Sequence, residues 1–341
     1  MKQRIIDLLA ASRFANLPTV WSNILLGFLL GWAAKLHQPG IDQAFSLPPL
    51  ADPAAWRGAH PLITLLALVL PASCLYLGGC FLNDWKDADF DRAHKPERPI
   101  PAGRFPRGLL LGLALLFLGG GLALSAALSN AAALLALGIV LCILAYTHWH
   151  KVSPWSFAFM AGARALLYPF ALFALTPWPV FQRFLSFQKE LPAPWLLPVL
   201  MLGLAAYILG ISLFARHESR RLSGDFKPAP GLIALFILPL ITGTALLAPA
   251  SSVWQVLLAI SPLAVTLFLL IHLFGKERDI GAFVSRALAA IPLVDATAAL
   301  LLLYPFITKQ MLAPTQAGVL YLAFFAFSLL ALLLQRLAPA T

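Results

Sequence analysis

The sequence predicts an all-α polytopic membrane protein, and two features of its composition lead to that fold class. Hydrophobic residues make up 60% of the 341 positions and charged residues only 11%, whereas a soluble domain carries about 25% charged residues. Uncharged apolar runs recur along the chain, and each reaches the roughly 20 residues that a transmembrane helix needs. We therefore expect one transmembrane domain over residues 1–341, with no room for a soluble domain.

Ten spans are expected, because two of the apolar runs divide into helix pairs. The run Gly108–Thr147 is too long for one crossing and has a turn signal at Ser129–Asn130. The run Pro228–Phe274 divides in the same way at Pro249–Ser252. The other spans are Leu17–Leu36, Pro61–Leu82, Trp155–Ala174, Trp195–Ala215, Ala287–Ile307 and Ala317–Leu334.

The basic residues follow this predicted topology. With a cytoplasmic N-terminus, 18 of the 24 Lys and Arg residues fall inside, five fall outside, and Arg164 lies within a span. This distribution is the positive-inside bias of membrane proteins. The net charge of +10 therefore reflects the topology, and nucleic acid is not expected as a partner. We expect the protein in a bacterial inner membrane, with its N-terminus and its active site toward the cytoplasm.

Carboxylates gather where the second span ends, and five of the 14 acidic residues lie within positions 84–97. If the helix continues, Asn83, Asp87 and Asp91 recur at every fourth position. Asp84 joins the same face three residues before Asp87, whereas Asp89 points elsewhere. Carboxylates stacked on one face repel one another unless a cation neutralises them, and such hard oxygen ligands select Mg²⁺ or Ca²⁺.

Two other interpretations fit this acidic stretch less well. A solvated acidic helix end is common, but it rarely aligns its carboxylates beside a bilayer, and the positive-inside bias disfavours it there. An EF-hand loop beginning at Asp87 would place Arg92 where Gly is required and Arg98 where Glu is required. We therefore expect a metal site made by Asn83, Asp84, Asp87 and Asp91.

Basic residues follow the carboxylates directly, in a segment stiffened by three prolines. Carboxylates followed by cations beside an apolar cavity suit a lipid with a phosphate or diphosphate head group. Mg²⁺ bridges acid to phosphate, and arginine and lysine neutralise the remaining charge. The basic residues of this segment are Arg92, Lys95, Arg98 and Arg104.

The order of these residues matches a known signature. The stretch reads Asn83-Asp84-x-x-Asp87-x-x-x-Asp91, followed by Lys95-Pro-Glu-Arg98-Pro-Ile-Pro-Ala-Gly103. It strongly resembles the first signature of the UbiA superfamily of intramembrane prenyltransferases. Weaker similarity links Arg13, Pro18, Asn23 and Gly27 to the family's first helix. Tyr146 and Lys151 are similar to the end of its fourth helix, where a lysine helps to hold the diphosphate.

The resemblance implies a UbiA-like bundle of nine to ten transmembrane helices around a central cavity. It also implies a prenyltransferase that uses Mg²⁺ to move an isoprenyl chain from its diphosphate to a small-molecule acceptor, aromatic or small and polar, within the membrane. Asp84, Asp87, Asp91 and Lys151 would be catalytic. Asn23, Asn83, Arg98 and Tyr146 would contact substrate.

The second signature departs from the family pattern. The family usually has another acidic cluster after its sixth helix. Here the acids of that segment are Glu218 and Asp225, and the cations Arg216, Arg220 and Arg221 lie around Glu218. A guanidinium can neutralise diphosphate oxygens directly. We therefore expect one tightly held Mg²⁺ at the first signature. An arginine clamp of Arg221 or Arg216 would lie opposite it, and Glu218 would orient the clamp or weakly share a metal. The alternative is that these arginines are ordinary positive-inside residues.

Polar residues inside the membrane are further candidates for functional residues, because placing a polar side chain in the bilayer costs free energy. Arg164 is a lone cation in mid-span; it binds an acceptor carboxylate or pairs with Asp295 of the ninth span. The histidines near span ends, among them His150, are read as ordinary interfacial residues.

A non-catalytic protein that binds or transports a lipid phosphate is the alternative to the enzyme, and the altered second signature is its best support. The intact first signature and Lys151 argue against it. A transporter would predict inverted repeats with broken spans, and the sequence has no such symmetry. Isoprenyl diphosphate, a membrane lipid and a small-molecule acceptor are thus the expected partners, with the identity of the acceptor open.

Overall fold

The polypeptide is helical wherever its structure is described. The computed structural model describes residues 2–37, 61–94, 96, 98, 100–153, 155–174, 176, 178–185, 196–215, 280–308 and 314–337. Every regular element in these ranges is a helix, and no strand occurs among them. The all-α fold class predicted from the sequence is therefore confirmed.

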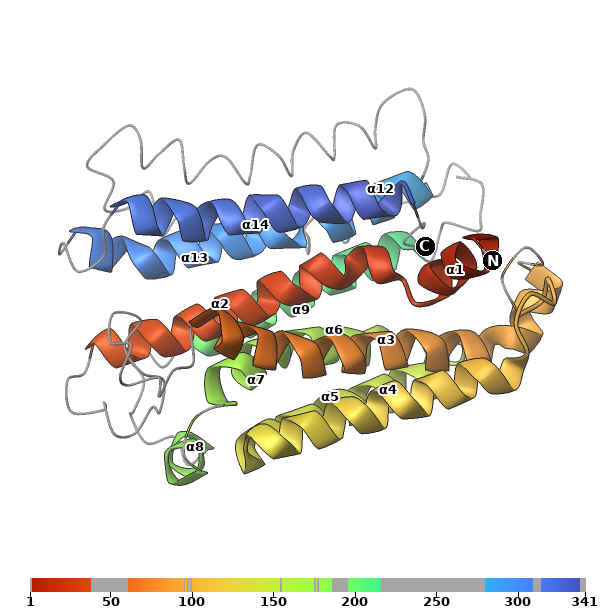
Figure 1. The fold of residues 1–341 in the computed structure, drawn as a ribbon, viewed down its shortest axis with the longest axis horizontal. Coiled ribbons are helices and arrows are strands. Elements are labelled where there is room, and N and C mark those ends of the chain that lie inside the picture. The colour runs from red at the N-terminus through yellow and green to blue at the C-terminus, as the bar shows by residue number, and fades with distance from the viewer. Residues whose placement is uncertain are drawn as a thin grey trace.

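The helices follow the order of the predicted spans, and Figure 1 shows most of them running side by side along the long axis. In chain order they are α1 (Lys2–Ala11), the 3-10 helix η1 (Phe14–Asn16), α2 (Leu17–His37), α3 (Pro61–His94), α4 (Arg107–Leu128), α5 (Asn130–Trp149), α6 (Ser156–Ala165), α7 (Leu167–Phe173), α8 (Trp178–Leu185), α9 (Leu196–Ala215), α12 (Ile280–Ala289), α13 (Ile291–Thr308) and α14 (Pro314–Gln335).

Eight helical segments in the described ranges are long and apolar enough to cross a membrane. They correspond to eight of the ten predicted spans. The other two, within Pro228–Phe274, lie outside the described residues. The chain is thus an integral membrane protein.

The predicted division of Gly108–Thr147 falls at Ser129. Its hydroxyl accepts a hydrogen bond from the backbone N–H of Ala132 at 3.1 Å, which is the usual role of a serine at a helix start. The same hydroxyl donates to the carbonyl oxygen of Ala174 at 2.7 Å. The turn therefore also ties the pair α4–α5 to the end of α7.

The fifth predicted span, Trp155–Ala174, is a broken helix. α6 ends at Ala165, and α7 begins at Leu167. Pro169 explains the break, because its ring clashes with the carbonyl group four residues earlier, at Ala165, and it has no N–H to donate. Arg164 consequently lies at the end of one short helix and Tyr168 at the start of the next.

Helix α2 lies between the layer of α12–α14 and the layer of α3–α5 (Figure 1). Leu26 and Leu29 pack with the C-terminal helices, while Ile24 and Phe28 pack with α3, α4 and α5. α7 approaches α2 closely at Gly27, where an added Cβ would lie 2.5 Å from the backbone oxygen of Tyr168. This approach brings the α6–α7 break against the polar residues of α2.

Helix α3 is longer than the membrane core. It has 34 residues, which corresponds to about 51 Å at 1.5 Å per residue, whereas the hydrocarbon core is about 30 Å thick. The apolar part ends at Leu82, and the regular helix continues to His94. This continuation carries the acidic signature beyond the apolar segment.

Candidate active site

The carboxylates at the end of α3 divide between two faces of the helix. Asp84, Asp87 and Asp91 are buried. The Asp89 side chain is 64% exposed and pairs with Arg92 and Arg107. The structure therefore places the three acids of the predicted metal site together on the inner face, and Asp89 away from them.

Two arginines from outside α3 neutralise the first and last of these acids. Arg13 Nη2 lies 3.2 Å from Oδ1 of Asp84. Arg98 Nη1 lies 2.9 Å from Oδ2 of Asp91 and 3.8 Å from Oδ1 of Asp84. Arg98 thus bridges two carboxylates that lie two helical turns apart, as its position shortly after the end of α3 allows.

Asp87 faces the end of α5 and the turn after it. Lys151 Nζ and His150 Nε2 lie 2.7 and 3.0 Å from its Oδ1, and Asn83 Nδ2 donates to its Oδ2 at 3.2 Å. The two contacts to Oδ1 are close, but their angles are not those of hydrogen bonds. His150 also stacks on Tyr146, with ring centroids 5.2 Å apart, so it is not the ordinary interfacial histidine that the sequence suggested.

The donor set fits a divalent cation that is shared with a phosphate group. Asn83 Oδ1 and Asp87 Oδ1 are buried and have no aligned hydrogen bond. Within the described ranges no three Asp, Glu, His or Cys side chains converge closely enough to enclose a metal ion. Mg²⁺ commonly takes only one or two protein carboxylates and completes its shell with water and substrate phosphate, which is the arrangement that these residues permit.

Arg13 lies in the site, although from the sequence it had no role there and showed only similarity to the family's first helix. It adopts a left-handed conformation, with φ 48° and ψ 41°, which is uncommon for a residue with a side chain. Burial acts to lower the pKa of the Arg13 guanidinium, but nearby groups, Asp84 first among them, outweigh burial. The pKa therefore lies above its ordinary value. The lone arginine just before an apolar span was the available signal.

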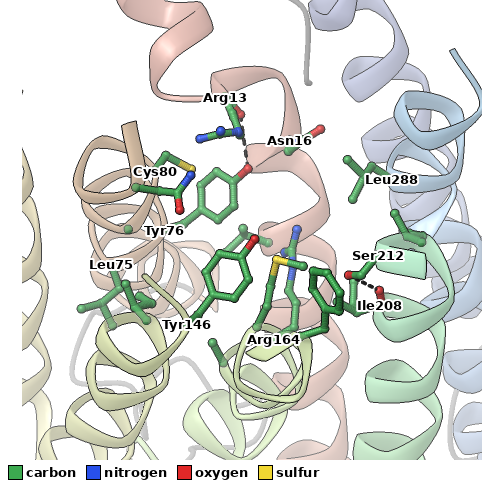
Figure 2. Close-up of a pocket in the computed structure, with 18 of the residues that line it drawn as sticks. Arg13, Asn16, Leu75, Tyr76, Cys80, Tyr146, Arg164, Ile208, Ser212 and Leu288 are labelled. Atoms are coloured by element: carbon green, nitrogen blue, oxygen red, sulfur yellow. Dashed lines mark hydrogen bonds between the residues drawn. The ribbon is translucent and has the colours of Figure 1, made fainter. Parts of the chain in front are cut away.

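A cavity of about 340 Å³ opens beside these residues. Figure 2 shows Tyr76 and Tyr146 pointing into it below Arg13, with Arg164 beside Tyr146. Most of its wall is apolar, with Asn83 and Arg98 among the polar exceptions. The apolar lining includes Val20, Ala72, Leu75, Ile139, Ile143, Met160, Leu167, Ile208, Val284 and Leu288.

Arg164 lines the cavity and is held by two neutral acceptors on α2. Nη1 donates to Oδ1 of Asn23 at 3.2 Å, and Nη2 donates to Oγ1 of Thr19 at 2.6 Å. Its guanidinium also lies 5.5 Å from the centre of the Tyr76 ring. No carboxylate of the described chain forms a direct ion pair with it.

The alternative of a direct pair between Arg164 and Asp295 is therefore wrong for this structure. Asp295 is fully buried and accepts three other hydrogen bonds. Ser22 and Asn23 donate to its Oδ2 at 2.6 and 2.8 Å, and Tyr168 donates to its Oδ1 at 2.6 Å. Asn23, predicted to bind substrate, stands between the two charges. The predicted clamp of Arg216, Glu218 and Arg221 lies outside the described residues.

Comparisons with known proteins agree on one family. A model of the UbiA prenyltransferase family matches residues 50–279. The digeranylgeranylglyceryl phosphate synthase of Pyrococcus abyssi is 32% identical over 217 residues, which are 62% of this chain and 69% of that protein. The protoheme IX farnesyltransferase of a Ruegeria species is 32% identical over 159 residues, which are 43% of this chain and 50% of that protein.

A solved structure supports the fold as well. The apo structure of a UbiA homologue from Aeropyrum pernix matches with a TM-score of 0.51 over 89% of this chain and 99% of that chain. The sequence identity is 15%, so this likeness speaks for the fold alone.

Proposed function

This chain belongs to the UbiA prenyltransferase family, and we propose that it transfers an isoprenyl group from an isoprenyl diphosphate to an acceptor with an anionic group. The relatives differ in acceptor: one is named for a glyceryl phosphate product and the other for protoheme IX. The acceptor of this chain must therefore be argued from its own residues.

The observation that supports the proposal is a cluster of charged residues beside an apolar cavity. Three buried carboxylates on α3 face long cations from three other segments, and the cavity beside them is mostly apolar. A diphosphate head needs cations and metal ligands, and an isoprenyl tail needs an apolar wall. Both requirements meet here within one site.

The head of the donor would be bound by exchange of partners. One or two of the carboxylates of Asp84, Asp87 and Asp91 would bind Mg²⁺ directly, with Asn83 Oδ1 as a neutral oxygen ligand, and the remaining acid would add negative charge beside the ion. Arg13, Arg98 and Lys151, which neutralise these acids in the free protein, would turn to the diphosphate oxygens, where charge-assisted hydrogen bonds are strongest.

The transfer step requires stabilisation of the charge on the leaving diphosphate and exclusion of water from carbon C1 of the isoprenyl chain. When bound, Mg²⁺ would withdraw charge from the diphosphate as the bond between C1 and oxygen breaks. The electron pair of that bond leaves with the diphosphate, an acceptor nucleophile supplies the pair for the new bond to C1, and its proton passes to the departing diphosphate. Lys151 and Arg98 stabilise the leaving charge, while the apolar wall keeps water from the allylic cation.

Arg164 is the proposed acceptor-binding residue, with Tyr146 beside it. It lines the same cavity as Asn83 and Tyr146. A guanidinium in an apolar wall favours a carboxylate or phosphate over a neutral group. The second clamp, Arg221 or Arg216 with Glu218, would contact the diphosphate from the opposite side, and the positive-inside bias puts this end of the site toward the cytoplasm.

The experiment uses the purified full chain in detergent with Mg²⁺. Labelled isoprenyl diphosphates of increasing length are combined with carboxylate- and phosphate-bearing acceptors, and extracted products are identified by mass spectrometry. We expect an alkylated anionic acceptor and released diphosphate. Tight donor binding without transfer to any acceptor would instead favour the non-catalytic lipid-phosphate protein.

A further inference from the structure

The buried groups behind Arg164 form a chain of three residues from three helices. Arg164 of α6 donates to the amide oxygen of Asn23 on α2, whose amide nitrogen donates to Asp295 of α13. Only the NH₂ group can face a carboxylate and only the oxygen can face a guanidinium, so the orientation of the amide is fixed. The amide therefore separates a buried cation from a buried anion.

The separation is noteworthy because a direct pair was sterically available. Aspartate has nearly the same shape as asparagine, so an acid at position 23 would meet Arg164 at the same 3.2 Å. Such a pair would neutralise the guanidinium and commit its fork to the protein. Instead both hydrogen-bond partners of Arg164, Asn23 and Thr19, are neutral.

Asp295 likewise has its hydrogen-bond donors without any contribution from Arg164. Its three donors, Ser22, Asn23 and Tyr168, are all neutral and lie within 2.8 Å. They come from α2 and α7, so the carboxylate fixes the position of α2 as well as the amide of Asn23. Its negative charge stays on the far side of that amide from the cavity.

Arg164 is consequently fixed in place without being neutralised. The two hydrogen bonds occupy two of its five N–H groups. Its side chain is more than nine-tenths buried and lines the cavity. The remaining N–H groups and the full positive charge are available to a ligand in that cavity.

We infer that Asn23 and Asp295 are positioning residues that hold Arg164 as an uncommitted anion receptor, and that this arrangement selects acceptors carrying a carboxylate or phosphate over neutral analogues. The inference rests on the proposed function and adds to it the two residues that keep Arg164 free to select the acceptor. The two anions share one chemistry at a guanidinium, and the probes below distinguish them.

The test exchanges the two residues. Asn23→Asp combined with Asp295→Asn conserves composition, volume and net charge but moves the carboxylate into direct contact with Arg164. Calorimetry then measures binding of benzoate, phenyl phosphate and neutral benzamide to the full chain in detergent. We expect the unmodified protein to prefer one of the two anions to benzamide by roughly ten- to a hundredfold, as charge-assisted hydrogen bonds allow.

The exchanged protein should lose that preference while it keeps its melting temperature and its affinity for geranyl diphosphate. Asp295→Asn alone should keep the preference, because Arg164 stays unneutralised. If the exchanged protein does not fold, Arg164→Gln decides, and it too should lose the preference. Retention of the preference by the exchanged protein or by Arg164→Gln, or its absence from the unmodified chain, would overturn the inference.

Binding and transfer remain separate readouts in this design. An anion preference without prenyl transfer to any acceptor would count against the proposed function and leave the receptor standing. Transfer to benzamide-like neutral acceptors with no anion preference would overturn the receptor and leave the prenyltransferase standing.

Discussion

Among the described residues, the buried carboxylates of α3 and the buried carboxylate of α13 are held in opposite ways. Asp84, Asp87 and Asp91 face long cations on flexible stems, and some of these contacts are not aligned as hydrogen bonds. Asp295 is surrounded by three neutral donors at hydrogen-bond distance. A carboxylate held by mobile cations can exchange those cations for a ligand, whereas a carboxylate that accepts hydrogen bonds from fixed neutral donors has a structural role.

The largest expected effect is the loss of transfer on Asp87→Ala. Removing a carboxylate of the metal site should lower the transfer rate by more than about a hundredfold. The rate is measured with a labelled donor at saturating Mg²⁺. Asp89→Ala is the matched control, since that side chain lies on the exposed face of the same turn; it should reduce the rate less than about threefold. Equal losses from both would show that the division of faces has no functional meaning.

Stability should respond in the reverse order. Asp295→Ala leaves three buried donors unpaired and should lower the free energy of unfolding by roughly 3 kcal/mol or more. Asp87→Ala should change it by less than about 1 kcal/mol, because Lys151, its charged partner at the shortest distance, has a long side chain that can reach water. Thermal unfolding in detergent compares them, and a larger destabilisation from Asp87→Ala would break the contrast between the two groups.

A smaller effect is expected from Arg164→Lys, which keeps the charge and loses the planar fork. The KM for an anionic acceptor should rise about tenfold, as the loss of one charge-assisted hydrogen bond allows, while the KM for the isoprenyl donor stays unchanged. Steady-state kinetics with each substrate varied in turn separates the two. An equal rise in both KM values would place Arg164 in general packing rather than at the acceptor.

The smallest effect concerns the arginines that follow α9 in the sequence. Arg221→Ala should weaken donor binding several-fold, as expected for one lost guanidinium–phosphate contact, and Arg220→Ala should weaken it less. Direct binding of a labelled donor at fixed Mg²⁺ tests this. A donor-bound crystal with two metal ions ligated by Glu218 and Asp225 would contradict the arginine clamp.

The sequence allowed prediction of features that depend on local pattern. The turn at Ser129 and the shared face of Asp84, Asp87 and Asp91 follow from capping chemistry and helical spacing, which are properties of adjacent residues. The broken fifth span was missed, although Pro169 was visible, because neighbouring helices decide whether a proline kinks a membrane helix or interrupts it.

Contacts between distant segments were beyond local pattern. Arg13 meets Asp84 across 71 positions, and Ser22 meets Asp295 across 273. The expected charge pair of Arg164 and Asp295 had the right charges, but nothing in the spacing shows that the amide of Asn23 comes between them. His150 was likewise read as interfacial, since only the packing of α5 on α3 sets it against Asp87.

The central claim is that the α3 carboxylates exchange their protein cations for Mg²⁺ and a diphosphate. The most direct measurement is equilibrium binding of labelled geranyl diphosphate to the full chain, with Mg²⁺ and with a chelator. We predict tight binding only with Mg²⁺, lost in Asp87→Ala and kept in Asp89→Ala. Binding that is equally tight in the chelator, or unaffected by Asp87→Ala, would contradict the account.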